Sequence, residues 1–285
     1  MRPPYVTDEK IHQFVQAAFI EDIGEGDHST LSSIPEQSEQ SAYLLMKESG
    51  VVSGLELAPY VFHQLDPQLD INTLVNDGTS VAKGDVIMKL KGKVRAILTG
   101  ERLFLNIIQR MSGISTKTAQ LNSLIKGTNA KLLDTRKTTP NMRMFEKWAV
   151  VLGGGINHRY GLYDMVMLKD NHIDFAGGIS AAVDGSRKYI EEKGLNLKIE
   201  VEVRNLDEVR QALDTGRVDR IMLDNMSTEE MTEAVQLIAG RSETEASGGI
   251  TEKTIRSVAL TGVDYISVGA LTHSIKSLDI SLKAE

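Results

Sequence analysis

Residues 133–140, LDTRKTTP, bring an acid, three hydroxyls and two adjacent cations to the end of a short apolar run. Arg136 can donate two parallel hydrogen bonds to a carboxylate or phosphate, and Lys137 adds a point charge. Residues 134–172 carry six Lys or Arg and four Asp or Glu, a balance of +2 in a chain of net charge −7. This cationic zone predicts a site for a small anion. A solvated surface strip is the alternative.

Six apolar runs end in polar residues in this way: KLLDTRK, DMVMLKDN, LKIEVEV, RIMLDN, TEASGG and DYISVGA. Helical patterns separate most of them, and two of these helices have N-cap residues in Asn205 and Ser227. Strands that alternate with helices predict a parallel sheet with right-handed crossovers. The late strands recur every 21–24 residues or so, which favours a barrel. Six strands are too few for a closed barrel, so we expect one that is incomplete or open on one side.

The carboxyl ends of parallel strands form the active site in α/β folds, so these polar residues are expected to converge. The cations available for an anionic ligand are Arg102, Arg136, Lys137, Arg159 and Lys169. Each of them taken alone is more simply a surface cation, but six segments that end alike favour a shared site. His158, beside Arg159, can donate to an anion or serve a structural purpose.

Two acids and two glycine turns are further candidates for the site at the carboxyl ends of the strands. Glu202 and Asp224 follow neighbouring strands and suit a magnesium ion that bridges phosphates, or ion pairs with nearby cations. Glycine turns follow the last two strands and precede expected helix starts, with Ser247, Gly248 and Gly249 before Thr251, and Gly269 and Ala270 before Thr272. Backbone N–H groups at such helix starts bind phosphate well, although a glycine turn alone is a weak signal.

The first hundred residues predict a mixed α and β region. Residues 8–20 have helical spacing, residues 41–98 alternate as antiparallel strands do, and a helix interrupts them near residues 55–65. Residues 100–113 predict another helix, which Gly113 is expected to end.

Bulk composition excludes several classes of protein. The 285 residues are 41% hydrophobic and 25% charged, as in ordinary globular proteins. The sequence has no apolar run near the roughly 18 residues of a membrane span, and its start, MRPPYVTDEK, lacks the apolar core of a secretory signal. The absence of cysteine excludes disulfides and thiolate metal sites and fits a cytoplasmic protein. The acidic balance argues against nucleic-acid binding.

The run DTRKTTPNMRMFEKWAVVLGGGINHRYGLYDMVMLKDNHI resembles the signature of quinolinate phosphoribosyltransferases, the carboxylating nicotinate-nucleotide pyrophosphorylases. The resemblance continues, in order and over nearly the whole chain, through EDIGEGDHST, GERLFLNIIQRMSGIST, IEVEV, LDNM, EASGGIT and YISVGALTHS. It implies transfer of phosphoribosyl from phosphoribosyl pyrophosphate to quinolinate with loss of carbon dioxide, a step of NAD synthesis that uses Mg²⁺. It implies an α/β fold in a homodimer. The implied domains are an N-terminal α/β sandwich over residues 1–113, an open parallel barrel over 114–272 and a C-terminal helix over 273–285 that packs on the first domain.

The resemblance also implies roles for individual residues. Quinolinate is expected against Arg136, His158, Arg159 and Lys169, with Arg102 arriving from the neighbouring subunit and Lys137 facing an anion. Glu202 and Asp224 are expected to serve the ribose hydroxyls and Mg²⁺, and with Lys169 to be catalytic. The remaining substrate-binding residues, several of them for the 5′-phosphate, are Thr135, Ser247, Gly248, Gly249, Ser267, Val268, Gly269 and Ala270.

Three positions depart from the family pattern. Asn141 stands where glycine often follows TTP, and asparagine can still adopt a left-handed backbone. Trp148 stands where tyrosine is common, and we expect it to pack in the core. Gly249 replaces an asparagine, which is expected to weaken one phosphate or neighbouring contact without abolishing binding.

Three other functions fit parts of the pattern. A related family associated with molybdenum transport shares motifs and need not use quinolinate; carbon dioxide release that requires both substrates separates the two. A barrel lyase would form a Schiff base on Lys169, which borohydride would trap. A dicarboxylate sensor would bind its ligand without forming pyrophosphate.

Overall fold

The computed structural model describes residues 2–285, which divide into two compact units. The N-terminal unit contains the residues up to Ala119, together with Thr138–Gly154 and Leu271–Glu285. The barrel unit contains Gln120–Lys137 and Gly155–Ala270. These boundaries differ from the expected ones, because residues 138–154 belong with the first unit although they lie inside the stretch that was expected to form the barrel.

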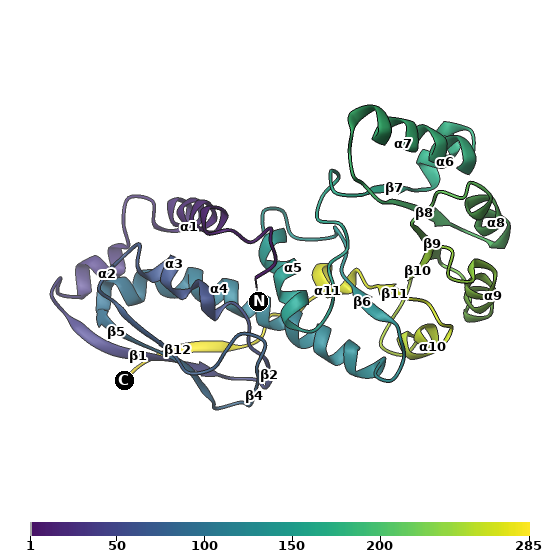
Figure 1. Cartoon of the computed structure of the whole chain (residues 1–285). Coiled ribbons are helices and arrows are strands. Elements are labelled where there is room, and N and C mark those ends of the chain that lie inside the picture. The colour runs from purple at the N-terminus through teal and green to yellow at the C-terminus, as the bar shows by residue number, and fades with distance from the viewer. Residues whose placement is uncertain (1) are drawn as a thin grey trace. The chain divides into compact units, whose positions relative to one another are not determined.

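The N-terminal unit is built on a four-stranded antiparallel sheet in the order β12-β1-β5-β3 (Figure 1). The strands are β12 (Ile280–Ala284), β1 (Glu39–Met46), β5 (Val86–Lys93) and β3 (Asp70–Thr73), and β2 (Gly50–Val51) pairs with β4 (Ser80–Val81). Its helices are α1 (Asp8–Ile23), α2 (His28–Ser33), η1 (Leu55–Leu57), α3 (Ala58–Phe62) and α5 (Arg143–Leu152). Most of α4 (Val94–Leu124) and of α11 (Ala270–His273) also belongs to this unit. Ala42, Leu44 and Met46 alternate along β1 and are buried, which gives the sheet one apolar face.

Two expectations for this unit are wrong. The helix expected to end at Gly113 runs from Val94 to Leu124 as α4. Gly113 is required for a different reason, because a Cβ at that position would collide with the backbone carbonyl of Lys276. The expected C-terminal helix is the strand β12, which pairs antiparallel with β1 and so does lie in the N-terminal unit.

The barrel unit contains the six expected parallel strands in one sheet, in the order β6-β11-β10-β9-β8-β7. Their bounds are β6 (Lys131–Leu133), β11 (Tyr265–Ser267), β10 (Glu243–Ser247), β9 (Arg220–Asp224), β8 (Ile199–Val203) and β7 (Val166–Leu168). All five neighbouring pairs are parallel. Since β6 and β7 stand at opposite ends of this order, the sheet is an open barrel, as predicted.

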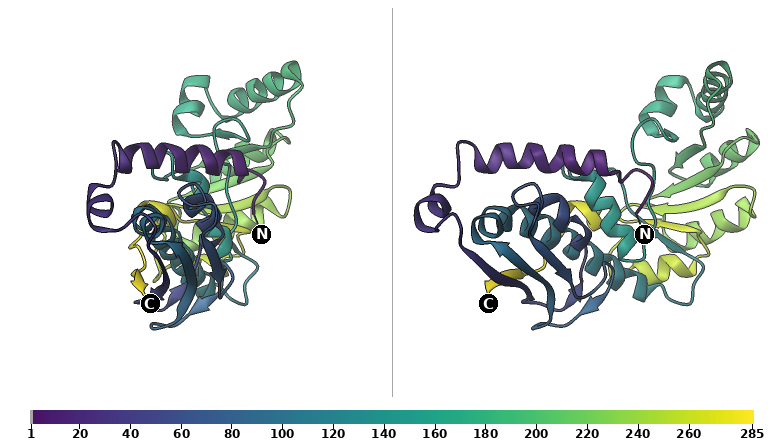
Figure 2. Two further views of the ribbon diagram at one scale, coloured as in Figure 1. Left: turned by 90° about the vertical axis from the view of Figure 1, so that its left-hand side faces the viewer. Right: turned by 60° about the vertical axis from the view of Figure 1, so that its left-hand side comes forward.

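Helices between these strands cover one face of the sheet (Figure 1 and Figure 2). They are α6 (Asp170–Ala176), α7 (Ile179–Lys193), α8 (Leu206–Asp214), α9 (Thr228–Ile238) and α10 (Ile255–Leu260). The predicted caps are confirmed, because the side chains of Asn205 and Ser227 accept hydrogen bonds from the backbone of Glu208 and Glu230. Within residues 2–285, no helix has the length and hydropathy that crossing a membrane requires.

The two faces of the barrel sheet differ in chemistry. Alternate residues of β8, Ile199, Val201 and Val203, are fully buried and apolar, as expected of the face that α7 and α8 cover. The residues between them, Glu200 and Glu202, lie on the opposite face because side chains alternate along a strand. Equivalent positions on β9 and β10 hold further charged residues. The register places Glu200 beside Arg220, and Arg220 beside Glu243. The inner face of the barrel therefore carries charges below its carboxyl ends.

Candidate active site

Two arginines approach each other at the carboxyl end of the barrel. Arg136 follows β6, and its buried Nε has no hydrogen-bond acceptor among residues 2–285. Arg159 is half-buried, and its Nη1 donates to the backbone carbonyl of Met165 at 3.3 Å. Burial, and after it the positive charge of Arg136, lowers the pKa of Arg159. Two cations that repel each other beside an unused buried donor form a site that an anion would complete.

Lys169, Glu202 and Asp224 also meet at this end of the sheet, as predicted. Lys169 directly follows β7 and caps α6, and its Nζ lies 3.4 Å from Glu202 Oε2. Burial raises the pKa of Glu202, and the charge of Asp224 raises it further, whereas Lys169 opposes the rise. Asp224 accepts a hydrogen bond from Asn225 Nδ2 at 2.6 Å. The Lys169–Glu202 contact also confirms the alternative for Glu202, which was an ion pair with a nearby cation.

The two acids fit a magnesium ion. Mg²⁺ is usually bound in proteins through one or two carboxylates, with water and substrate phosphates filling its other positions. Glu202 and Asp224 stand on neighbouring strands, both are partly buried, and the charge of Asp224 disfavours the ionised form of Glu202. A divalent cation between them would relieve that repulsion.

The turn after β10 has the backbone that a close ligand approach requires. Gly248 and Gly249 both have left-handed φ angles, +94° and +59°. A Cβ on Gly248 would collide with the side chain of Asn225, whose backbone N–H donates to the carbonyl of Ser247 at 2.9 Å. The helix expected at Thr251 begins later, with α10 at Ile255, so the turn does not lead directly into a helix.

The turn after β11 is arranged differently. The hydroxyl of Ser267 donates to Glu245 Oε1 at 2.5 Å, inside the barrel. The backbone N–H of Val268 donates to the carbonyl of Leu133 at 3.0 Å. Gly269 and Ala270 come next and are partly exposed, and Ala270 opens α11. Of this group, therefore, Gly269 and Ala270 are better placed than Ser267 and Val268 to receive a ligand.

The segment around Arg136 contains the other predicted residues. Thr135 Oγ1 accepts a hydrogen bond from the backbone N–H of Lys137 at 3.1 Å, and the Lys137 side chain is exposed. Asn141 adopts a left-handed φ of 64°, which confirms that this turn survives without glycine. Trp148 is buried, which confirms its interpretation as a packing residue. Arg102 lies exposed on α4 in the N-terminal unit, and its predicted role in a neighbouring subunit stays a prediction.

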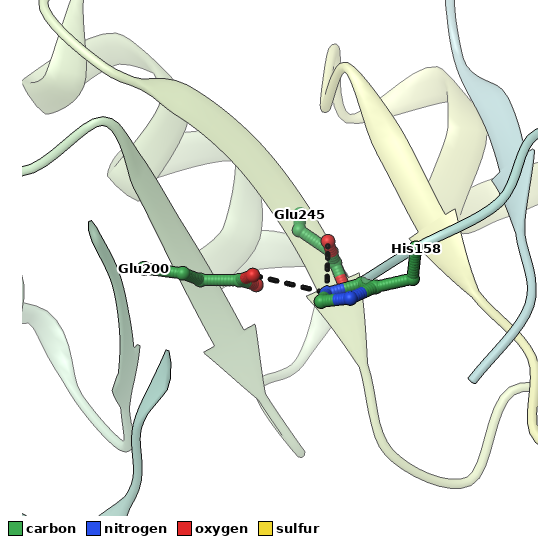
Figure 3. A group of neighbouring side chains, drawn as sticks. All are labelled: His158, Glu200 and Glu245. Atoms are coloured by element: carbon green, nitrogen blue, oxygen red, sulfur yellow. Dashed lines mark ion pairs between the residues drawn. The ribbon is translucent and has the colours of Figure 1, made fainter. Parts of the chain in front are cut away.

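His158 is buried among acids (Figure 3). Its Nε2 lies 3.0 Å from Glu200 Oε2 and 3.4 Å from Glu245 Oε2, and its Nδ1 accepts the backbone N–H of Arg159 at 2.7 Å. Both ring nitrogens are thus engaged within the barrel unit. Burial lowers the pKa of His158, whereas the carboxylates of Glu200 and Glu245 beside Nε2 raise it. The Arg159 N–H opposes that rise, because a protonated Nδ1 would set two donors face to face. We therefore assign a neutral ring with its proton on Nε2.

Sequence reasoning did not single out Glu200 or Glu245. The alternation in IEVEV does place Glu200 on the same face as Glu202, but only the register across strands shows that it meets His158. Both carboxylates are fully buried. Burial raises the pKa of Glu200, the contact with His158 opposes the rise, and the charge of Glu245 adds to it.

Comparison with known proteins decides the family. Residues 27–112 match the model of the quinolinate phosphoribosyl transferase N-terminal domain, and residues 114–283 match that of the C-terminal domain. The chain belongs to the quinolinate phosphoribosyl transferase family. The family models meet near residue 113, where the sequence predicted a domain boundary, although α4 runs through that point.

Similar proteins carry names from this family. The chain is 44% identical to quinolinate phosphoribosyltransferase (decarboxylating) 1b of Nicotiana tabacum, over 100% of this chain and 85% of that one. It is 43% identical to the probable nicotinate-nucleotide pyrophosphorylase (carboxylating) of Bacillus subtilis, over 93% and 90%. The solved nicotinate-nucleotide pyrophosphorylase of Francisella tularensis superposes with a TM-score of 0.92 at 42% identity, covering 98% of each chain.

Proposed function

We propose that this chain joins quinolinate to phosphoribosyl pyrophosphate and releases pyrophosphate and carbon dioxide, giving nicotinate mononucleotide for NAD synthesis. The activity is that of the family, and the relatives with 43–44% identity are named for it. The structural observation that carries the proposal is the pair Arg136 and Arg159, two neighbouring cations with an unused buried donor. Quinolinate is a dicarboxylate, and such a ligand would supply the acceptors and the negative charge that this pair lacks.

The cations would bind and orient quinolinate. Arg136 and Arg159 can each hold a carboxylate with two parallel hydrogen bonds, and Lys169 adds charge from the end of β7. Lys137 is exposed next to Arg136 in the sequence and would add positive charge near an anionic group of either substrate. Fixing the ring in this way would present its nitrogen to the sugar, which converts a bimolecular encounter into a positioned reaction.

The acids and the glycine turns would hold the sugar donor. Glu202 and Asp224 can accept hydrogen bonds from the ribose hydroxyls, and they are the residues that would bind Mg²⁺. When bound, the ion would neutralise pyrophosphate charge and so assist its departure. The backbone of Gly248, Gly249 and Gly269 lies at the ends of β10 and β11, where a 5′-phosphate can approach closely because these residues lack a Cβ.

The chemistry then needs no covalent nucleophile on the protein. Pyrophosphate would leave an oxocarbenium-like sugar as the pyridine nitrogen attacks its anomeric carbon. The nitrogen becomes positively charged, and the adjacent carboxylate can then leave as carbon dioxide, because the electrons left behind sit next to that positive nitrogen. A proton finally replaces the lost carboxylate on the ring. Positioning and charge stabilisation would supply the rate.

A homodimer belongs to the proposal. The resemblance brings Arg102 to the site of a neighbouring subunit, and Arg102 is an exposed cation on α4, as such a role requires. A third arginine at the site would add to the positive charge that faces two multiply anionic substrates.

The function is tested by following nicotinate mononucleotide in a mixture of purified protein, quinolinate, phosphoribosyl pyrophosphate and Mg²⁺. The proposal expects product and carbon dioxide only when both substrates are present. Carbon dioxide release without the sugar donor would favour a lyase, and quinolinate binding without pyrophosphate release would favour a sensor. Lack of turnover with quinolinate would leave the relative associated with molybdenum transport as the better assignment.

Replacing Asp224 with asparagine should raise the Mg²⁺ concentration for half-maximal rate by about tenfold or more, because it removes one of the two carboxylate ligands proposed for the ion. Glu202→Gln should act in the same direction. The measurement is a Mg²⁺ titration at saturating substrates. Asp207→Asn is the matched control, since Asp207 is an exposed acid on α8 that pairs with Arg210. An Asp224→Asn enzyme with the wild-type Mg²⁺ requirement would exclude the metal role.

A further inference from the structure

A buried acid pair lies inside the barrel, below the proposed substrate site. Glu200 of β8 and Glu245 of β10 are both fully buried, and both reach His158 Nε2, at 3.0 and 3.4 Å (Figure 3). Among residues 2–285, neither oxygen of Glu200 has a hydrogen-bond partner, and its contact with His158 is an ion-pair distance. Burying two carboxylates is costly, so their presence calls for an explanation that the binding of substrates by Arg136 and Lys169 does not provide.

A metal ion does not explain the cluster. The ligand atoms of His158, Glu200 and Glu245 lie within 4.8 Å of one another, which is close enough for an ion. An imidazole that binds metal through Nε2 carries its proton on Nδ1 and donates it to an acceptor. Here Nδ1 faces the N–H of Arg159, which is a donor. The proton must lie on Nε2, so this nitrogen, which the two carboxylates approach at 3.0 and 3.4 Å, has no lone pair to offer a metal ion.

Glu200 and Glu245 instead begin a chain of contacts that runs through His158 to the backbone of Arg159. Glu245 is held from two neighbouring strands, by Arg220 Nη1 at 2.9 Å and by the hydroxyl of Ser267 at 2.5 Å. Glu245 and Glu200 hold Nε2 of His158, and Nδ1 of the same ring accepts the backbone N–H of Arg159. The orientation of the imidazole therefore sets the position of the Arg159 backbone.

A second buried acid fixes the same segment from its other side. Asp134, directly after β6, accepts the backbone N–H of His158 at 2.9 Å and Asn157 Nδ2 at 2.6 Å. Residues 157–159 are thus tied to β6 through Asp134 and to β8 and β10 through the ring of His158. Glu200 and Glu245 lie on regular strands rather than on loops, so their backbone positions are well fixed.

We propose that Glu200 and Glu245 are positioning residues that hold the His158 ring, and through it Arg159, in the orientation that binds a quinolinate carboxylate. The inference rests on the proposed function, since it concerns the quinolinate end of that site. It assigns to the buried acids a role in the affinity for quinolinate and none in the binding of the sugar donor, which is proposed to contact other residues of β8 and the turn after β10.

The test compares two variants of Glu200. Leucine resembles the glutamate side chain in size but removes the acceptor for Nε2, so Glu200→Leu should raise the KM for quinolinate about tenfold. The KM for phosphoribosyl pyrophosphate should stay within about twofold of the wild type, because the two sites differ. Glu200→Gln keeps a carbonyl acceptor at the same place and should restore most of the affinity for quinolinate. If the leucine variant fails to fold, Glu200→Met is measured with the same expectation.

Glu243→Gln is the matched control. Glu243 lies on the same face of β10 and binds Arg220 and Lys198, but it does not contact His158. It should leave both KM values unchanged. A wild-type quinolinate KM in the leucine variant, or an equal rise in both KM values, would overturn the positioning role. The wild-type enzyme is assayed alongside: its inactivity would overturn the proposed function and this inference together, whereas an active wild type with an unaffected leucine variant refutes the inference alone.

Discussion

Arg136→Ala should lower kcat/KM for quinolinate by about a hundredfold, with a higher KM and a lower kcat. Removing one partner of a desolvated charge pair costs about 3 kcal/mol, which corresponds to a factor of this order. Arg136 has a buried Nε with no acceptor among residues 2–285, so its hydrogen-bonding capacity is reserved for a ligand. The loss should therefore appear in binding and also in the positioning of the ring nitrogen. Initial rates against quinolinate, at saturating sugar donor and Mg²⁺, measure both parameters.

Arg210→Ala provides the comparison for this prediction. Arg210 is an exposed arginine on α8 that pairs with Asp207, so its removal takes the same charge from the chain at a place outside the proposed site. Its catalytic efficiency should match that of the wild type. An Arg136→Ala enzyme with unchanged kcat/KM would refute the assignment of Arg136 to quinolinate, and with it the observation on which the proposed function depends.

The fold of the barrel unit could be predicted because its signals are local. Each strand is a short apolar run, each ends in polar residues, and the spacing between the late strands is regular. The N-terminal unit was harder to predict because distant contacts decide it. Gly113 looks like a helix end, but α4 continues past it, and glycine is needed there because residue 276 passes close by. The last residues form β12 because β1 offers them an edge, which no local pattern reveals.

The residues of the site also divide into those that the sequence could predict and those that it could not. Arg136, Lys169, Glu202 and Asp224 could be found because parallel strands bring their carboxyl ends together, whatever lies between them in sequence. Glu200 and Glu245 could not, because their partner His158 is far away in the sequence. It lies more than forty residues before Glu200 and more than eighty before Glu245. Burial of charge is visible only when the third dimension is known, since a sequence shows the charge but not the desolvation.

Mixing two inactive variants should restore activity if Arg102 serves a neighbouring subunit. In a hybrid of Arg102→Ala and Lys169→Ala chains, one site combines the intact Lys169 of one chain with the intact Arg102 of the other. The second site of that hybrid lacks both. Random exchange at equal concentrations makes half of the dimers hybrid, so about a quarter of wild-type activity should return from a background near zero. The measurement is activity after mixing, with exchange followed by a mass tag on one variant.

The matched mixture pairs Lys169→Ala with Arg136→Ala, the variant expected to lose about a hundredfold in kcat/KM. Both changes lie in the barrel unit, so each chain of that hybrid carries a substitution in its own site. Both sites are therefore impaired, whichever chain supplies Arg102. The mixture should stay near the low activity of its parents. Recovery in the first mixture but not the second would therefore place Arg102 in trans, because only a residue contributed across subunits can be supplied by the other chain. If exchange is demonstrated and the Arg102→Ala mixture stays inactive, each site is complete within one chain, and the role proposed for Arg102 is wrong.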